Sequence, residues 1–128
     1  MSHPRRTALV TGGSAGIGLA LARVLAREGH GLVLVARRKD RLEAVARELA
    51  EAHGVPTTAI DLDLGEPGSP AALCERLAAA GLTVDVLVNN AGYGYLSAVE
   101  EGDDAEVRAL FDTNFFGAVR PVDWPWPR

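Results

Sequence analysis

Short apolar segments alternate along the chain with longer segments in which apolar residues recur at helical spacing. The short segments, which we predict to be strands, are residues 7–10, 31–36, 57–61 and 84–89. The first of them, TALV, shows no alternation of apolar and polar residues, as expected for a strand that is buried on both faces of a sheet. Strands that alternate with helices are typically parallel and joined by right-handed helical crossovers. The pattern therefore predicts an α/β fold built on a parallel sheet.

The longer segments predict helices over residues 16–28, 40–53, 69–81 and 103–119. Glycines stand where the first three can end, at Gly29, Gly54 and Gly81. Ser69 can cap the third helix, and Pro70 suits its first helical position. We expect helices to bury an apolar stripe against the sheet. The expected stripes are Ile17, Ala20, Leu21, Val24 and Leu25 in the first helix, Leu42, Val45, Ala46, Leu49 and Ala52 in the second, and Val107, Leu110, Phe111 and Phe115 in the last.

Composition narrows the class of protein. The 128 residues suit one compact domain, and 48% hydrophobic with 23% charged residues is ordinary for a globular protein. A net charge of −4 gives no indication of a nucleic-acid or membrane-surface partner. No apolar run reaches the ~20 residues that a membrane span requires, and the single cysteine, Cys74, excludes a disulfide framework. We expect a cytoplasmic protein with a buried, reduced thiol.

The sequence TGGSAGIG joins the first predicted strand to the first predicted helix. Gly12 permits a tight turn, while Gly16 and Gly18 let the backbone approach a ligand and let the helix pack close to the sheet. Amide groups at the start of the helix would face a pyrophosphate, aided by the helix dipole, with Ser14 and Ile17 beside it. A glycine-rich turn without a ligand is the alternative, but the strand–loop–helix context favours a dinucleotide site.

Three motifs, in the same order and on the same elements, resemble those of the short-chain dehydrogenase/reductase family. TGGSAGIG matches the cofactor loop of that family, NNAG at residues 89–92 matches its second signature, and Asn114 in DTNFFGAV lies where the family keeps a catalytic asparagine. The resemblance covers residues 7 to about 120. It implies a Rossmann-type doubly wound parallel sheet, of which this chain has the part with strand order 3-2-1-4 and flanking helices. It also implies hydride transfer between a nicotinamide cofactor and an alcohol or carbonyl compound.

The residue at the end of the second strand normally selects between the two nicotinamide cofactors. An acidic residue there binds the ribose hydroxyls of NAD and repels a 2′-phosphate. This chain has Arg37 at that position with Arg38 beside it, and guanidinium groups bind phosphate through charge-assisted hydrogen bonds. A solvated basic edge is the alternative interpretation, although cations are unfavourable at the start of a helix. The sequence therefore predicts that NADP(H) is preferred over NAD(H).

The resemblance also implies where the rest of the cofactor binds. Asp63 and Leu64, after the third strand, would contact the adenine, the carboxylate accepting from its amino group and the leucine packing on the ring. Asp61 is the competing candidate if the register differs by two residues. The residues of the NNAG motif that would lie beside the cofactor are Asn90, Ala91 and Gly92.

Most of the family's catalytic residues have no counterpart in the chain. The family uses a tyrosine as general acid–base, a lysine four residues later that lowers the pKa of that tyrosine, and a serine that positions the carbonyl group. Neither Tyr93 nor Tyr95 is followed by such a lysine, because Lys39 is the only lysine and precedes both; Asn114 alone has a counterpart. The sequence thus predicts an NADP(H)-dependent oxidoreductase by family that is inactive as a lone chain. The alternative is a catalytically silent NADP-binding module or a poorly folded remnant.

The last residues of the chain depart from the family pattern. Residues 121–128 hold three prolines and both tryptophans, which prevents a further strand. We therefore divide the chain into an incomplete cofactor-binding domain, residues 1–120, and an irregular tail, residues 121–128, which we interpret as the result of a truncation or frameshift. The fourth strand and the last helix, with Phe111, Phe115 and Phe116, would then be exposed. We expect marginal stability, or self-association through these surfaces.

Overall fold

The computed structural model describes residues 5–92 and 99–112 of the chain. Its sheet contains the strands β1 (Thr7–Thr11), β2 (Gly31–Ala36), β3 (Thr57–Asp61) and β4 (Val86–Val88). The strands lie in the order β3-β2-β1-β4, and every pairing between them is parallel. The predicted strand order and the Rossmann-type architecture are confirmed.

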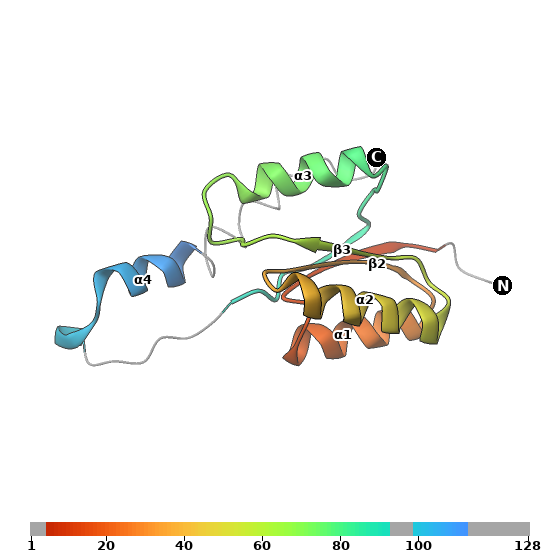
Figure 1. Cartoon of the computed structure of the whole chain (residues 1–128), viewed down its shortest axis with the longest axis horizontal. Helices are drawn as coiled ribbons and strands as arrows, with labels where there is room; N and C mark the ends of the chain where they lie inside the picture. The colour runs from red at the N-terminus through yellow and green to blue at the C-terminus, as the bar shows by residue number, and fades with distance from the viewer. Residues whose placement is uncertain (1–4, 93–98, 113–128) are drawn as a thin grey trace.

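Helices cover both faces of the sheet (Figure 1). One face carries α1 (Gly16–Arg27) and α2 (Lys39–His53), and the other carries α3 (Ser69–Ala79). A short 3-10 helix, η1 (Val99–Glu101), precedes α4 (Asp104–Phe111), which lies to the left of the sheet in Figure 1. Because all strands are parallel, their carboxyl ends meet at one edge of the sheet, and the loops that follow them lie together there.

Alternate side chains of β1 are buried on opposite faces of the sheet. Ala8 and Val10 pack into the core beneath α1 and α2, whereas Leu9 packs into the core beneath α3. All three are fully buried. The same arrangement continues into β2, because Ala8 pairs with Leu32 and Leu9 with Val33. Burial on both faces explains why this part of the sequence shows no alternation of apolar and polar residues.

The prediction of which residues of α1 face the core is wrong. The buried residues of this helix are Gly18, Ala22 and Ala26, which recur every four residues. Their small size lets α1 lie close to the sheet, and the half-buried Leu19 and Leu25 pack against the same core. The predicted stripe is exposed apart from the half-buried Leu25: its exposed members are Ile17 (73%), Ala20, Leu21 (39%) and Val24 (39%).

Other differences concern the ends of elements. Ala52 is exposed at the end of α2, whereas the other four residues of its predicted stripe are buried. The N-cap of α3 is Gly68 rather than Ser69, and its φ of 82° lies in the left-handed region that glycine favours. β4 is shorter than the strand predicted over residues 84–89, since it begins at Val86 and ends at Val88. Val84 is buried but precedes the strand.

The last predicted helix begins as expected. Asp103 is the N-cap of α4, and its carboxylate accepts a hydrogen bond from the backbone N–H of Glu106 (3.1 Å). The continuation of this helix to residue 119, with Phe115 and Phe116, and the predicted tail at residues 121–128 lie outside the described residues. Among the described helices, none combines the length and the hydropathy that a membrane span requires.

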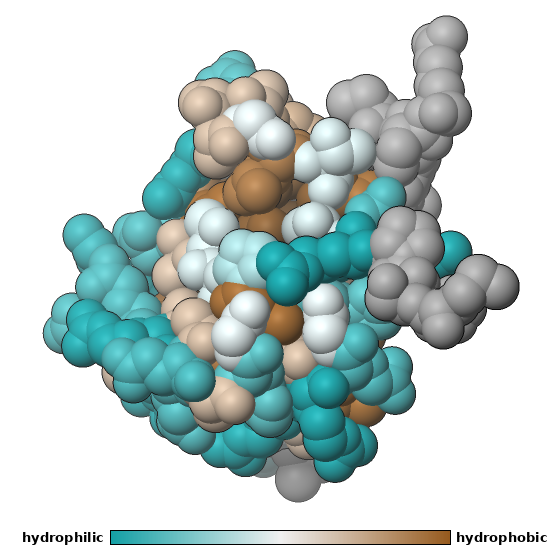
Figure 2. Space-filling view, turned by 90° about the vertical axis from the view of Figure 1, so that its right-hand side faces the viewer, coloured by the Kyte–Doolittle hydropathy of each residue, from teal (hydrophilic) through white to brown (hydrophobic). Residues whose placement is uncertain are grey.

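The two faces of the sheet differ in how completely they are covered. Figure 2 views the molecule from the end at which β1 begins, and hydrophilic residues dominate its lower half, where α1 and α2 lie. Its upper half, where α3 lies, shows apolar residues at the surface beside that helix. A single described helix on that face leaves part of the apolar surface uncovered.

Candidate functional site

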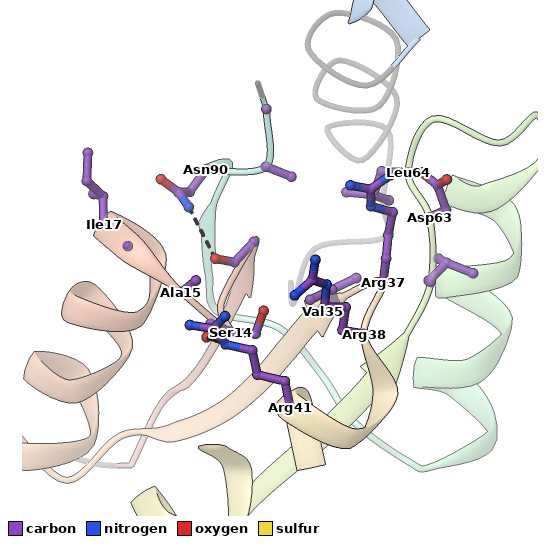
Figure 3. Close-up of a pocket in the computed structure, with 16 residues that line it drawn as sticks. Ser14, Ala15, Ile17, Val35, Arg37, Arg38, Arg41, Asp63, Leu64 and Asn90 are labelled. Atoms are coloured by element: carbon purple, nitrogen blue, oxygen red, sulfur yellow. Dashed lines mark hydrogen bonds between the residues drawn. The ribbon is translucent and has the colours of Figure 1, made fainter. Parts of the chain in front are cut away.

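A cavity of about 650 Å³ opens at the carboxyl ends of the strands (Figure 3). Its volume lies within the range of about 300–1,000 Å³ that is usual for cofactor sites. The segments that follow β1, β2, β3 and β4 all contribute to its walls. The predicted site residues that line it are Gly12, Ser14, Gly16, Ile17, Arg37, Arg38, Asp63, Leu64, Asn90, Ala91 and Gly92. The structure therefore brings residues of four separate sequence motifs around one cavity.

The glycine loop turns sharply between β1 and α1. Gly12 has a φ of 66° and Gly16 a φ of 57°, both in the left-handed region where a Cβ would be unfavourable. The backbone N–H of Gly12 donates to the carbonyl oxygen of Val35 (2.8 Å), which holds the start of the loop to β2. Gly18 lies behind the loop rather than in the cavity wall, and a Cβ there would stand 2.2 Å from the carbonyl oxygen of Gly12. Gly18 therefore allows α1 to approach the loop.

Three arginines line one side of the cavity. Arg37 and Arg38 follow β2 directly, Arg41 lies in the first turn of α2, and all three are exposed. Figure 3 shows Arg37 extending toward Leu64, whereas Arg41 reaches the glycine loop. There the Nε of Arg41 donates to the carbonyl oxygen of Ser14 (3.0 Å). This side of the cavity concentrates positive charge and suits an anionic group of a ligand.

The loop after β3 places an acidic and an apolar residue on the cavity. Asp63 accepts a hydrogen bond at Oδ1 from the backbone N–H of Gly65 (2.8 Å), which orients its carboxylate. Leu64 is 7% exposed and packs into the core beneath α3 while it lines the cavity. The competing candidate, Asp61, does not line the cavity and pairs instead with Arg76, at 3.5 Å between Oδ1 and Nη2. The geometry favours Asp63 over Asp61 as a contact of any ligand in the cavity.

The NNAG segment is tied to the end of β1 by a buried hydroxyl. Thr11 is 1% exposed, and its Oγ1 accepts hydrogen bonds from the backbone N–H groups of Asn90 (2.9 Å) and Ala91 (3.0 Å). The same hydroxyl donates to the carbonyl oxygen of Val88 (3.3 Å). The side chain of Asn90 in turn donates to the carbonyl oxygen of Gly12 (3.4 Å). Thr11 and Asn90 thus hold the NNAG segment against the glycine loop.

Sequence analysis gave no site role to some residues that line the cavity or hold its loops. Arg41 carried a usable signal, because it belongs to the same basic cluster, RRKDR, as Arg37 and Arg38. Thr11 carried a weaker signal, since a polar residue at the end of a buried strand requires hydrogen-bond partners. The remaining missed residues are Ala15, Val35, Ala36 and Leu62, which carry no polar side chain that a motif would reveal.

Some candidate residues fall outside the described part of the chain, namely Asn114, Tyr93 and Tyr95. Within residues 5–92 and 99–112, no cluster of three or more His, Cys, Asp or Glu side chains is placed to hold a metal ion. Cys74 is half-buried on α3, and burial raises the pKa of its thiol, which keeps it in the less reactive protonated form. The cavity itself offers backbone amides, guanidinium groups, a carboxylate and a carboxamide, which are groups that bind polar and anionic ligands.

Comparison with known proteins identifies the family. A family model described as short chain dehydrogenase matches residues 6–124. The chain belongs to the short-chain dehydrogenase family. This confirms the resemblance that the glycine loop and the NNAG motif indicated. Retinol dehydrogenase 8 from Homo sapiens is 41% identical over 128 residues, an alignment that covers 95% of this chain and 39% of that protein. The 11-beta-hydroxysteroid dehydrogenase 1A of Arabidopsis thaliana is 40% identical over 120 residues, which cover 89% of this chain and 33% of that protein.

Solved structures of short-chain dehydrogenases have the same fold. The L-sorbose reductase from Gluconobacter frateurii, complexed with NADPH and L-sorbose, gives a TM-score of 0.88 at 37% identity, covering 95% of this chain and 46% of that one. An alcohol dehydrogenase from the archaeon Thermococcus sibiricus, complexed with 5-hydroxy-NADP, gives a TM-score of 0.87 at 38% identity, covering 92% and 50%. The chain thus spans half or less of the length of these relatives.

Proposed function

We propose that the cavity binds NADP(H) and that the chain is the cofactor-binding part of an oxidoreductase of the short-chain dehydrogenase/reductase family. The observation that carries the proposal is that the glycine loop and the arginine side of the cavity meet at the carboxyl ends of parallel strands. A glycine loop that opens a helix suits a pyrophosphate, and guanidinium groups after the second strand suit a 2′-phosphate. The complexes of the two solved relatives with NADPH and 5-hydroxy-NADP support the choice of cofactor.

The residues of the cavity fit the parts of such a cofactor. Gly12 and Gly16 keep the loop free of side chains that would occupy the space of the phosphates; a Cβ at Gly12 would also stand 3.0 Å from the side-chain nitrogen of Asn90. Arg37 and Arg38 would hold the 2′-phosphate, and the carboxylate of Asp63 would accept from the adenine amino group. The other residues that we place against the cofactor are Ser14, Ile17, Leu64, Ala91 and Gly92, while Gly18 shapes the loop from behind.

The chain's own residues bind and orient the cofactor, whereas the family's acid–base pair is absent from the sequence. Bound NADPH supplies a hydride for the reduction of a carbonyl group. The general acid of the family is a tyrosine with a lysine four residues later, and no such pair occurs in the 128 residues. We therefore propose that this chain alone binds NADP(H) without turning over an alcohol or carbonyl substrate.

Titration of the purified chain with NADPH and NADH, followed by nicotinamide fluorescence, tests the proposal. We expect tighter binding of NADPH. Arg37→Gln removes a guanidinium group from the cavity and should weaken NADPH binding by about tenfold, with NADH affinity changed by less than about twofold. Arg47→Gln is the matched control, since Arg47 is an exposed arginine on α2 that does not line the cavity. It should leave both affinities unchanged.

Three results would contradict parts of this proposal. Binding of neither nucleotide to the wild-type chain would contradict it as a whole. Equal affinity for NADPH and NADH would contradict the preference for the phosphorylated cofactor. Reduction of carbonyl compounds by the purified chain, lost in Gly16→Val, would show that the chain catalyses hydride transfer without the tyrosine–lysine pair.

We also propose that copies of the chain associate through the edge of the sheet at β4. Among the described strands, β4 lies at the end of the order and pairs with β1 alone, so its other side carries backbone groups that can bind a further strand. Each copy presents the same edge, so two copies can pair about a two-fold axis.

A further inference from the structure

We propose that Arg41 is a positioning residue that fixes the peptide group between Ser14 and Ala15 in the orientation that an anionic cofactor requires. The inference rests on the proposed binding of a dinucleotide in this cavity. It assigns to Arg41 a different task from that of Arg37 and Arg38, which we place against the 2′-phosphate. Arg41 would instead act through the glycine loop, and therefore on NADPH and NADH alike.

Among the described residues, the side chain that holds the middle of the glycine loop is that of Arg41. The start of the loop is held by the N–H groups of Gly12 and Gly13, which donate to the carbonyl oxygen of Val35 at 2.8 and 3.4 Å. Farther along, the carbonyl oxygen of Ser14 receives the hydrogen bond from the Nε of Arg41 (3.0 Å). Glycine residues with positive φ stand on both sides of Ser14, at positions 12 and 16. Because glycine adopts many backbone conformations at little cost, the segment between them needs an external contact to keep one orientation.

The orientation of this peptide group matters because its two ends have opposite polarity. A trans peptide is planar, so the carbonyl oxygen of Ser14 and the N–H of Ala15 point in opposite directions. Both residues line the cavity, as does Arg41. When the guanidinium group of Arg41 holds the carbonyl oxygen of Ser14, the N–H of Ala15 points away from Arg41. A flip of the peptide would exchange the two, and a carbonyl oxygen repels a phosphate group that an N–H would bind.

The chemistry of arginine suits this task. The Nε–H donates along a direction set by the planar guanidinium group, and a hydrogen bond from a charged donor to a carbonyl is stronger than one between neutral groups. Arg41 lies in the first turn of α2, whose later residues Leu42, Val45 and Leu49 are buried in the core. The side chain thus reaches the loop from a rigid helix and ties the loop to it.

The test compares Arg41→Gln, Arg41→Lys and the control Arg47→Gln in the full chain. NADPH and NADH affinities are measured by fluorescence titration, and amide hydrogen exchange of residues 13–16 is measured without nucleotide. We expect Arg41→Gln to weaken both nucleotides by the same factor, about fivefold to tenfold, and to speed exchange in the loop. Arg41→Lys should retain affinity within about threefold, because an ammonium group can still donate to the Ser14 carbonyl. Thermal unfolding should be the same in Arg41→Gln and Arg47→Gln, which separates loop positioning from a general effect on stability.

Two results would overturn the inference. A loss confined to NADPH in Arg41→Gln would make Arg41 a direct ligand of the 2′-phosphate. Affinities and loop exchange equal to those of Arg47→Gln would show that the contact with Ser14 has no effect. If the wild-type chain binds neither nucleotide, the proposed function fails, whereas the exchange measurement still decides whether Arg41 holds the loop.

Discussion

Gly18 lies where α1 passes close to the backbone of Gly12 in the glycine loop. In most helices a glycine is unfavourable, and its replacement by alanine stabilises by about 1 kcal/mol. Here an added Cβ would stand 2.2 Å from the carbonyl oxygen of Gly12 and 2.5 Å from the side-chain nitrogen of Asn90. The first of these neighbours is backbone, so the clash can be relieved only by moving the loop or the helix. The steric effect therefore outweighs the helix propensity.

We expect Gly18→Ala to destabilise the chain by about 2–3 kcal/mol and to weaken NADPH binding at least about tenfold, because the displaced loop no longer fits the phosphates. Urea unfolding and nucleotide titration measure the two effects. Gly54→Ala is the control: Gly54 has a φ of 63°, with no atom within 4 Å of an added Cβ. This change should cost only about 1 kcal/mol of strain and leave NADPH affinity unaltered. A stable Gly18→Ala variant with normal affinity would contradict the structure of the loop.

At the residue scale, the sequence was informative where a residue type has few other uses. Glycines between a strand and a helix, and paired arginines after the next strand, predicted residues that do line one cavity. The resemblance to the family selected Asp63 over Asp61, and in the structure Asp63 lines the cavity whereas Asp61 pairs with Arg76. The contact from Arg41 to Ser14 joins residues 27 positions apart through a backbone carbonyl. Every residue has a backbone carbonyl, so the sequence does not indicate which one accepts this hydrogen bond.

Among the described residues, the buried hydroxyl of Thr11 joins β1 to the segment after β4. Thr11 accepts from two backbone N–H groups and donates to one carbonyl oxygen. Thr11→Val preserves shape but leaves these groups without their partner, and we expect a loss of about 2–3 kcal/mol in the free energy of unfolding. NADPH affinity should fall about fivefold, because the hydrogen bond from Asn90 to Gly12 then lacks its support. Chemical denaturation and titration provide the measurements.

The matched substitution is Thr57→Val on β3. The hydroxyl of Thr57 donates to the carbonyl oxygen of Val55 (3.3 Å), and the residue is half-buried on a strand, where valine is favoured. Thr57→Val should therefore change stability by less than about 1 kcal/mol and leave NADPH affinity as it is. Equal effects of the two valine variants would show that the hydroxyl of Thr11 has no special role in joining the two segments.

At the scale of elements, periodicity predicted which segments are helices and which are strands but misjudged how one helix packs. Helix α1 carries two apolar stripes, one of small residues at Gly18, Ala22 and Ala26 and one of larger residues that includes Leu21 and Val24. Hydrophobic spacing alone favours the larger stripe. The close approach at Gly18 places the small stripe against the sheet, and the small size of Gly18, Ala22 and Ala26 is what permits it.

At the scale of the whole molecule, the exposed stripe of α1 bears on how copies of the chain could associate. Arg23 pairs with Glu48 of α2 (3.8 Å between Nη2 and Oε1), which marks the side of α1 that faces α2. Leu21 is two residues earlier, so it points to the opposite side, toward the edge where β4 lies. Val86 and Val88 of β4 are half-buried and pack against the core on the face of the sheet that carries α1. The edge strand and the exposed flank of α1 thus place apolar residues on the same face of the sheet.

We propose that two copies of the chain associate through the β4 edge and the exposed apolar residues of α1. We expect the sedimentation coefficient of the purified chain to rise with protein concentration, as in a monomer–dimer equilibrium. Val24→Gln places a polar side chain on the apolar flank and should raise the dissociation constant by about tenfold, which corresponds to about 1.4 kcal/mol.

A closely matched control lies on α4. Val107 is 38% exposed, against 39% for Val24, but α4 stands apart from the sheet in Figure 1. Val107→Gln should therefore leave the dissociation constant unchanged. A reversed outcome, in which only Val107→Gln weakens association, would assign the interface to the last helix. A single sedimentation coefficient at all concentrations, together with a cooperative unfolding transition at high temperature, would show instead that the monomer tolerates an unpaired β4 edge.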